Sequence, residues 1–69
     1  MEDLKHSIFS QDFMIKNKQY KGTVYIDNEG VYWIIITKDG EEISRKIYVG
    51  KINDLYMVME MEKMVNENA

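Results

Sequence analysis

Hydrophobic and polar positions alternate through the middle of the chain, and glycine-closed turns separate the alternating segments. The pattern predicts strands at residues 20–26, 31–37 and 41–49, the last ending before Gly50. The connecting segments 27–30 and 38–40 combine Asp or Asn with a final Gly, which is typical of tight turns because Gly adopts left-handed backbone conformations cheaply. Consecutive strands joined by short loops predict an antiparallel meander.

The two ends of the chain predict further elements. Residues 13–16 are a candidate first strand, followed by a turn at 17–19. In residues 2–9, Leu4 and Ile8 lie one helical turn apart, so we expect a short helix there.

The C-terminal segment predicts a longer helix. Asn53 or Asp54 can cap it, and the apolar residues that follow form one helical stripe: Met57, Val58, Met61, Met64 and Val65. Residues 55–61 also alternate, as in a strand, but Met, Glu and Lys favour the helix. The expected fold class is α+β: a single domain over residues 1–69, in which a small antiparallel β-meander of three to four strands packs against a C-terminal α-helix.

Turn lengths set the strand register, and the register assigns side chains to the two faces of the sheet. A four-residue loop pairs Val24 with Trp33, and a three-residue loop pairs Trp33 with Arg45. One face then forms the core under the helix, with Val24, Ile26, Val31, Trp33, Ile35, Ile43, Ile47 and Val49. The other face carries Lys21, Thr23, Tyr25, Tyr32, Ile34, Ile36, Ser44, Lys46 and Tyr48.

The strand at 31–36 is apolar on both faces, which a 69-residue chain has little material to cover. Domains of this size bury only about 60% of their unfolded surface, and without cysteine the chain has no disulfide to compensate. We therefore expect a homo-oligomer, with interface residues Tyr25, Tyr32, Ile34, Ile36 and Tyr48 on the sheet and Met57, Met61 and Met64 on the helix. The alternative is that the N-terminal segment or the first strand covers this face within one chain.

Composition narrows the function classes. The net charge of −3 argues against a dedicated nucleic-acid binder, and a single histidine without cysteine argues against a tight metal site. No acid–base or nucleophile constellation stands out, so we expect neither an enzyme nor a bound cofactor.

No signal-like or membrane-spanning apolar run occurs, so the expected location is cytoplasmic. Abundant Ile, Lys, Asn, Tyr and Met with no Pro is typical of AT-rich genomes, such as those of low-GC bacteria and their phages.

The sequence therefore predicts a small non-enzymatic binding or regulatory protein that homo-oligomerises and binds or occludes a partner, such as a host or regulatory protein. The alternative is an oligomer that sequesters a small anionic ligand such as a nucleotide at subunit interfaces. Arg45 and Lys46 would hold its phosphate, and Trp33 or Tyr32 would stack on its base.

A second alternative is DNA binding by the sheet. Three strands and a helix, with Lys21, Lys46 and Arg45 on or beside the sheet, resemble the layout of the arm-type DNA-binding domains of tyrosine integrases. The resemblance covers layout and no motif, and it implies a basic sheet face in the major groove. Ile34, Ile36 and the acidic net charge depart from it.

Overall fold

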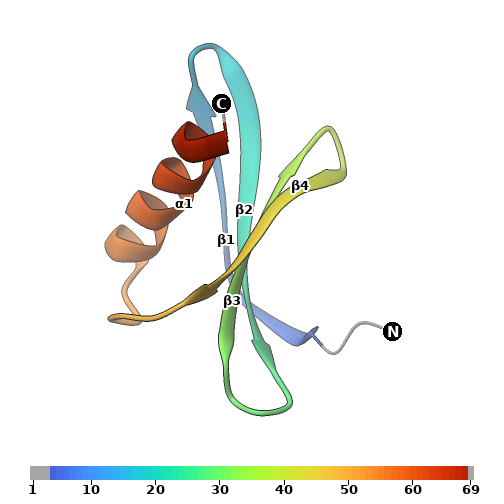
Figure 1. Cartoon of the computed structure of the whole chain (residues 1–69), viewed down its shortest axis with the longest axis vertical. Coiled ribbons are helices and arrows are strands. Elements are labelled where there is room, and N and C mark those ends of the chain that lie inside the picture. The colour runs from blue at the N-terminus through green and yellow to red at the C-terminus, as the bar shows by residue number, and fades with distance from the viewer. Residues whose placement is uncertain (1–3, 69) are drawn as a thin grey trace.

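The computed structural model describes residues 4–68 of the chain, with side chains for residues 6–67. Four strands precede one helix: β1 (Leu4–Ile15), β2 (Lys18–Asp27), β3 (Tyr32–Lys38), β4 (Glu41–Tyr48) and α1 (Asp54–Asn68). The strands form one antiparallel sheet in chain order, and α1 lies against one of its faces (Figure 1). The predicted α+β meander with a C-terminal helix is confirmed.

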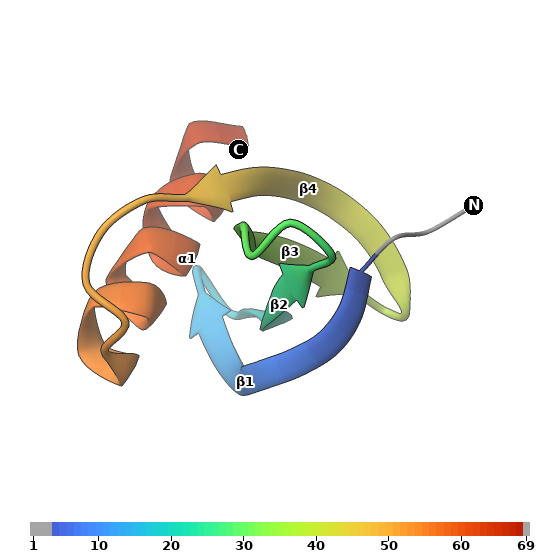
Figure 2. The same cartoon turned by 90° about the horizontal axis from the view of Figure 1, so that it is seen from below.

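The predicted N-terminal helix is wrong. Residues from Leu4 onward belong to β1, which pairs with the whole length of β2, and Glu2 and Asp3 lie outside the described residues. A helix of eight residues is marginal by itself, so pairing with a long neighbouring strand prevails. Register shifts at Leu4/His6 and Ser7/Phe9 mark bulges, and β1 curves strongly along its length (Figure 2).

Two of the hairpin loops are shorter than predicted. Lys16 and Asn17 connect β1 to β2 with φ values of 53° and 67°, and Asp39 and Gly40 connect β3 to β4 with φ values of 56° and 81°. Two successive positive φ values define a type I′ turn, whose twist matches that of the flanking strands. The predicted turn at 17–19 is therefore corrected to 16–17, and the three-residue loop at 38–40 to 39–40.

The β2–β3 loop is held by the carboxylate of Asp27. Its Oδ1 accepts hydrogen bonds from the backbone N–H groups of Glu29 and Val31, each at 2.9 Å, and its Oδ2 accepts one from the indole Nε1–H of Trp33 at 2.9 Å. The indole hydrogen bond is the main reason why the pKa of Asp27 lies below its ordinary value. This clasp keeps Val31 in the loop, so that Ile26 pairs with Tyr32.

Because Val31 stays in the loop, the pairing of β3 with β2 is shifted by one residue, and the two faces of β3 are exchanged relative to the prediction. Val24 pairs with Ile34 instead of Trp33, so the side of β3 that carries Ile34 and Ile36 faces α1. Trp33 and Ile35 lie on the opposite side, which we call the outer face. The predicted core face is therefore wrong for β3 and β4, because a one-residue shift reverses every side chain. On β4, Ile43 and Ile47 are exposed at 42% and 48%, whereas Tyr48 is buried.

The core lies between α1 and the sheet, and the helix contacts all four strands (Figure 2). Its buried members are Phe13, Tyr20, Val24, Ile34, Ile36, Tyr48, Met57, Met61, Met64 and Val65. Gly22 lets the helix approach closely, since a Cβ at this position would lie 2.2 Å from the Sδ of Met61. The predicted methionine stripe of the helix is its buried face.

Candidate interaction surface

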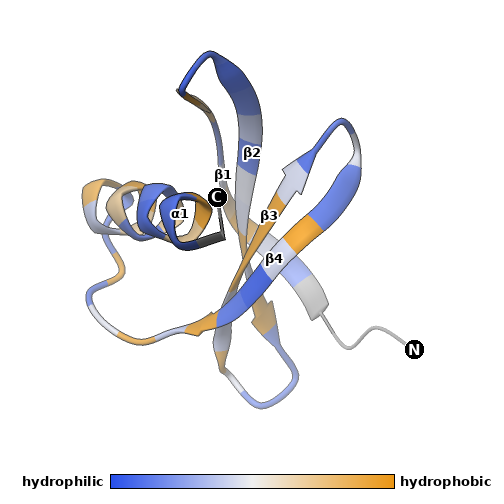
Figure 3. Ribbon diagram, turned by 45° about the horizontal axis from the view of Figure 1, so that its top comes forward, coloured by the Kyte–Doolittle hydropathy of each residue, from blue (hydrophilic) through white to orange (hydrophobic). Residues whose placement is uncertain are grey.

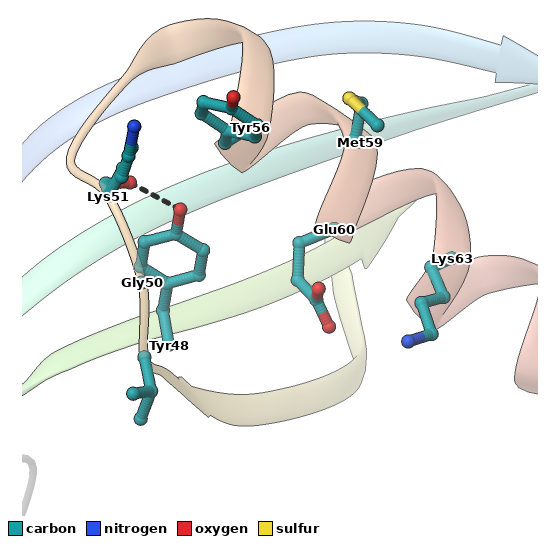
Figure 4. A pocket seen from close by; sticks show the side chains of 8 residues that line it. Tyr48, Gly50, Lys51, Tyr56, Met59, Glu60 and Lys63 are labelled. Carbon is teal, nitrogen blue, oxygen red and sulfur yellow. Dashed lines mark hydrogen bonds between the residues drawn. The ribbon is translucent and has the colours of Figure 1, made fainter.

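The segment that joins β4 to α1 is held in place by local hydrogen bonds. The Tyr48 hydroxyl donates to the backbone carbonyl of Lys51 (Figure 4). Between them, Gly50 has a φ of 149°, which side chains of L-residues rarely tolerate. Asn53 then caps α1, because its Oδ1 accepts hydrogen bonds from the backbone N–H groups of Leu55 at 2.9 Å and Tyr56 at 3.4 Å. The chain thus turns sharply from the edge strand into the helix.

This segment leaves large apolar side chains open to solvent. Their exposed fractions run from 46% for Tyr56 to 89% for Val49, and together they amount to about three whole side chains. We call this set the junction patch; its members are Val49, Ile52, Leu55, Tyr56 and Met59. Figure 3 shows hydrophobic residues recurring along the same stretch of chain. The patch is a candidate binding surface, because contiguous exposed apolar residues mark interaction sites.

A pocket of about 500 Å³ opens beside the patch (Figure 4). Its apolar lining includes Val49, Met59 and the rings of two tyrosines, and its charged lining is Lys51, Glu60 and Lys63. The Lys51 ammonium lies 5.8 Å from the centre of the Tyr56 ring, where a cation–π attraction operates.

The Glu60 carboxylate is already engaged. It accepts a hydrogen bond from the Lys46 ammonium at 2.5 Å, an ion pair that also raises the pKa of Lys46. With this acid neutralised by Lys46, the positive charges of Lys51 and Lys63 dominate the pocket.

The predicted ligand-binding residues do not converge. Trp33 and Arg45 belong to the outer face, whereas Lys46 reaches Glu60 of α1 and Tyr32 packs against the core on the helix face. Arg45 also holds Glu42 in a bidentate ion pair at 2.8 and 2.9 Å, which lowers the pKa of that carboxyl group. Within one chain the sheet separates these residues, so they form no single site there, and the phosphate-and-base site between subunits stays a prediction.

The predicted interface residues are mostly interior. The buried members are Ile34, Ile36, Tyr48, Met57, Met61 and Met64, while Tyr32 packs against the same core and Tyr25 is half-buried on the outer face. The six buried side chains are covered within one chain, so their assignment to an intermolecular surface is corrected, whereas the assignment of the half-buried Tyr25 and Tyr32 stays a prediction. The main cover is α1, and the first strand, which the alternative had also named, adds Phe13 to this core, with Phe9 and Ile15 packed against it.

The junction patch was missed, although the sequence carries a signal for it. Leu55 and Met59 lie one helical turn apart and on the side of α1 away from Met57 and Met61. A helix that is apolar on two sides is normally covered on both, and this one is covered by the sheet on one side.

Other kinds of site find little support in the part of the chain that the structure describes. Among the described residues, no group of three or more His, Cys, Asp or Glu side chains is placed to hold a metal ion. No helix over these residues has the length and apolar character to cross a membrane. Comparisons with models of protein families, with curated proteins and with solved structures give no match.

Proposed function

We propose that this chain is a small non-enzymatic binding protein that docks another polypeptide on the junction patch. The observation that carries the proposal is that none of these five side chains belongs to the buried core between α1 and the sheet. They are not needed to cover the sheet, yet they remain large and apolar. We therefore expect a binding partner to cover these five side chains.

The size of the patch indicates what kind of surface the occupant must present. Burying the equivalent of three apolar side chains yields roughly 5–9 kcal/mol at about 1.5–3 kcal/mol each. Association itself costs about 4–15 kcal/mol in lost freedom of motion. A polar surface would add no further apolar burial, so we expect the occupant to be apolar where it touches the patch.

The charges around the patch indicate the flanks of the occupant. Lys51 and Lys63 line the adjoining pocket, and Glu60 is occupied by Lys46. Acidic side chains beside the apolar contact would be attracted to these lysines, and complementary charge favours productive encounters. The proposed occupant is therefore an apolar polypeptide surface with acidic flanks.

Two observations favour this role over the alternatives. The acid in the pocket is held in an ion pair, so the lining offers no unengaged acid to work with a base. On the outer face, Arg45 is bound by Glu42 and Lys21 lies directly opposite Asp12 on β1. That arrangement lacks the cluster of uncompensated cations that DNA binding requires.

Site-specific photo-crosslinking tests the proposal. A benzophenone amino acid replaces Leu55 in one variant and Met14 in a matched control, because both side chains are well exposed, at 66% and 61%. In cells that carry the gene, we expect a discrete polypeptide adduct from position 55 and none from position 14. Equal labelling at both positions, or no adduct from position 55, would refute the proposed docking surface.

A further inference from the structure

We infer that the pocket beside the junction patch binds a small organic acid that carries its acidic groups at the ends of an apolar body. The inference goes beyond polypeptide docking and does not depend on it. The pocket has a volume of about 500 Å³, within the range of about 300–1,000 Å³ that small-molecule sites occupy. Ile52 and Leu55 of the patch do not line it, so a filled pocket leaves both open to a polypeptide.

Local hydrogen bonds and the helix hold the walls of the pocket. The Tyr48 hydroxyl donates a hydrogen bond to the backbone carbonyl of Lys51, and Asn53 caps the first turn of α1. The opposite wall is one side of α1, whose lining residues recur at helical spacing: Tyr56, Met59, Glu60 and Lys63. The pocket is therefore formed before a ligand binds, which lowers the entropic cost of binding.

The middle of the pocket is apolar. Its lining there consists of Val49, Met59 and the rings of Tyr48 and Tyr56. The Tyr48 ring is buried in the core, whereas the other three side chains are well exposed. A hydrocarbon body laid against them would remove apolar surface from water on both partners. This part of the pocket suits a flat ring or a short chain.

Positive charge lies at the two ends of the apolar stretch. The Lys51 ammonium lies 5.8 Å from the centre of the Tyr56 ring. Lys63 follows Tyr56 by two helical turns, which is about 10 Å along the helix axis. Figure 4 shows the two lysines at opposite ends of the row of lining residues. Among the described residues, neither lysine forms an ion pair with an acid.

The charge balance of the pocket favours an anion. Its acidic residue, Glu60, is bound by Lys46 at 2.5 Å, so the charges of the two lining lysines are left to attract a ligand. The chain as a whole carries a net charge of −3, which makes this positive charge a local property. Clefts lined by one sign of charge concentrate ligands of the opposite sign. Carboxylate or phosphate groups at the ends of the ligand are the chemistry that fits.

A second pocket, of about 300 Å³, lacks this combination of features. Its lining is Gln19, Tyr20, Lys21, Thr37, Asp39 and Gly40. It contains no aliphatic side chain to receive an organic body, and an acid accompanies its lysine. The arrangement of an apolar middle between two cations is therefore specific to the pocket beside α1.

An NMR titration with terephthalate tests the inference, because this probe carries a carboxylate at each end of a rigid ring. We expect saturable binding with a Kd of a few millimolar or less, and the largest amide shifts in residues 48–51 and 56–63. The neutral analogue para-benzenedimethanol should bind about tenfold more weakly, since both charge contacts are lost. No saturable binding up to about 30 mM, shifts centred elsewhere on the chain, or equal affinity for the neutral analogue would overturn the inference.

Lysine substitutions distinguish this pocket from a general attraction of anions. Lys51→Gln and Lys63→Gln should each weaken terephthalate binding about two- to fivefold, the usual effect of one exposed ion pair, and the double variant about tenfold. Lys18→Gln is the matched control, because Lys18 is also exposed and does not line the pocket; its affinity should equal that of the wild type. Amide spectra check that each variant folds.

Unchanged binding in the double variant, or an equal loss in the Lys18→Gln control, would overturn the inference. The docking surface is judged separately by the photo-crosslinker at position 55. If that position gives no polypeptide adduct while terephthalate binds as described, the docking surface is refuted and the ligand site stands.

Discussion

Replacing Gly22 with alanine tests how closely α1 packs on the sheet. In an uncrowded strand, Ala is more favourable than Gly by roughly 0.5–1 kcal/mol, because Gly loses more backbone freedom on folding. In this structure an ideal Cβ at position 22 would lie 2.2 Å from the Sδ of Met61 and 2.8 Å from its Cγ. Met61 is fully buried, so its side chain has little room to move away.

We therefore expect Gly22→Ala to lower the free energy of unfolding by about 1–3 kcal/mol, the usual range for overpacking a core. At roughly 0.05–0.15 kcal/mol per residue, a chain of 69 residues has a total stability of about 3.5–10 kcal/mol. The variant should remain folded but with a clearly reduced midpoint. Urea denaturation monitored by circular dichroism measures the change.

The same substitution in a Met61→Ala background completes a double-mutant cycle. Met61→Ala alone should cost about 2–5 kcal/mol, because it leaves a cavity. Once the long side chain is gone, Gly22→Ala should be neutral or stabilising, so the two effects should fall short of additivity by about 1–3 kcal/mol. An equal amount of trimethylamine oxide in all four samples keeps the weakest variant folded. A stabilising effect of Gly22→Ala in the wild-type background, or additive effects, would refute the close packing.

Three further predictions concern the loops. Asp27→Asn should lower the melting temperature at pH 6. Because the folded pKa of Asp27 lies below its ordinary value of 3.8, the stability that it contributes is present above pH 3.8 and is lost as the pH falls below it. The difference between wild type and variant should therefore shrink between pH 5 and about pH 2, and a constant difference would argue against the carboxylate clasp on Trp33. Tyr48→Phe should cost about 0.5–1.5 kcal/mol and should speed amide hydrogen exchange across residues 49–53, since the hydrogen bond to the Lys51 carbonyl is lost; unchanged exchange there would count against that bond. Asn17→Gly should raise the unfolding free energy by up to about 1 kcal/mol, because Gly relieves a left-handed residue at φ 67°; a loss of stability in urea titrations would contradict the assigned turn.

Local signals made the architecture predictable. The glycine-closed turns and the helical methionine stripe are determined by nearby residues, and both the meander and the buried face of α1 agree with them. The Asn53 cap was also predictable, because its role depends on the next three residues.

The face assignment of β3 depended on tertiary detail that the pattern does not carry. Alternation in residues 31–36 is equally apolar on both sides, so nothing local distinguishes Ile34 from Ile35. The choice is made by the Asp27 carboxylate, which holds Val31 in the loop and binds the Trp33 indole six residues along the chain. A one-residue difference in this loop moved Ile34 and Ile36 from a presumed interface into the core.

The candidate surface was hidden for a related reason. The sequence suggested an excess of apolar surface, and it pointed to the sheet because β3 is the most apolar strand. In the structure α1 covers that face, and five of the nine large apolar residues that are exposed in the described part of the chain lie where the covering helix begins. Leu55 and Met59 show in the sequence that α1 is apolar on a second side, but which of its two sides stays uncovered follows from the packing of the whole chain.

Photo-crosslinking from position 55 tests most directly the central claim, that the junction patch docks another polypeptide. The expected result is a discrete polypeptide adduct from position 55 and none from position 14, whose side chains are similarly exposed at 66% and 61%. No adduct from position 55, or equal labelling at both positions, would contradict the claim.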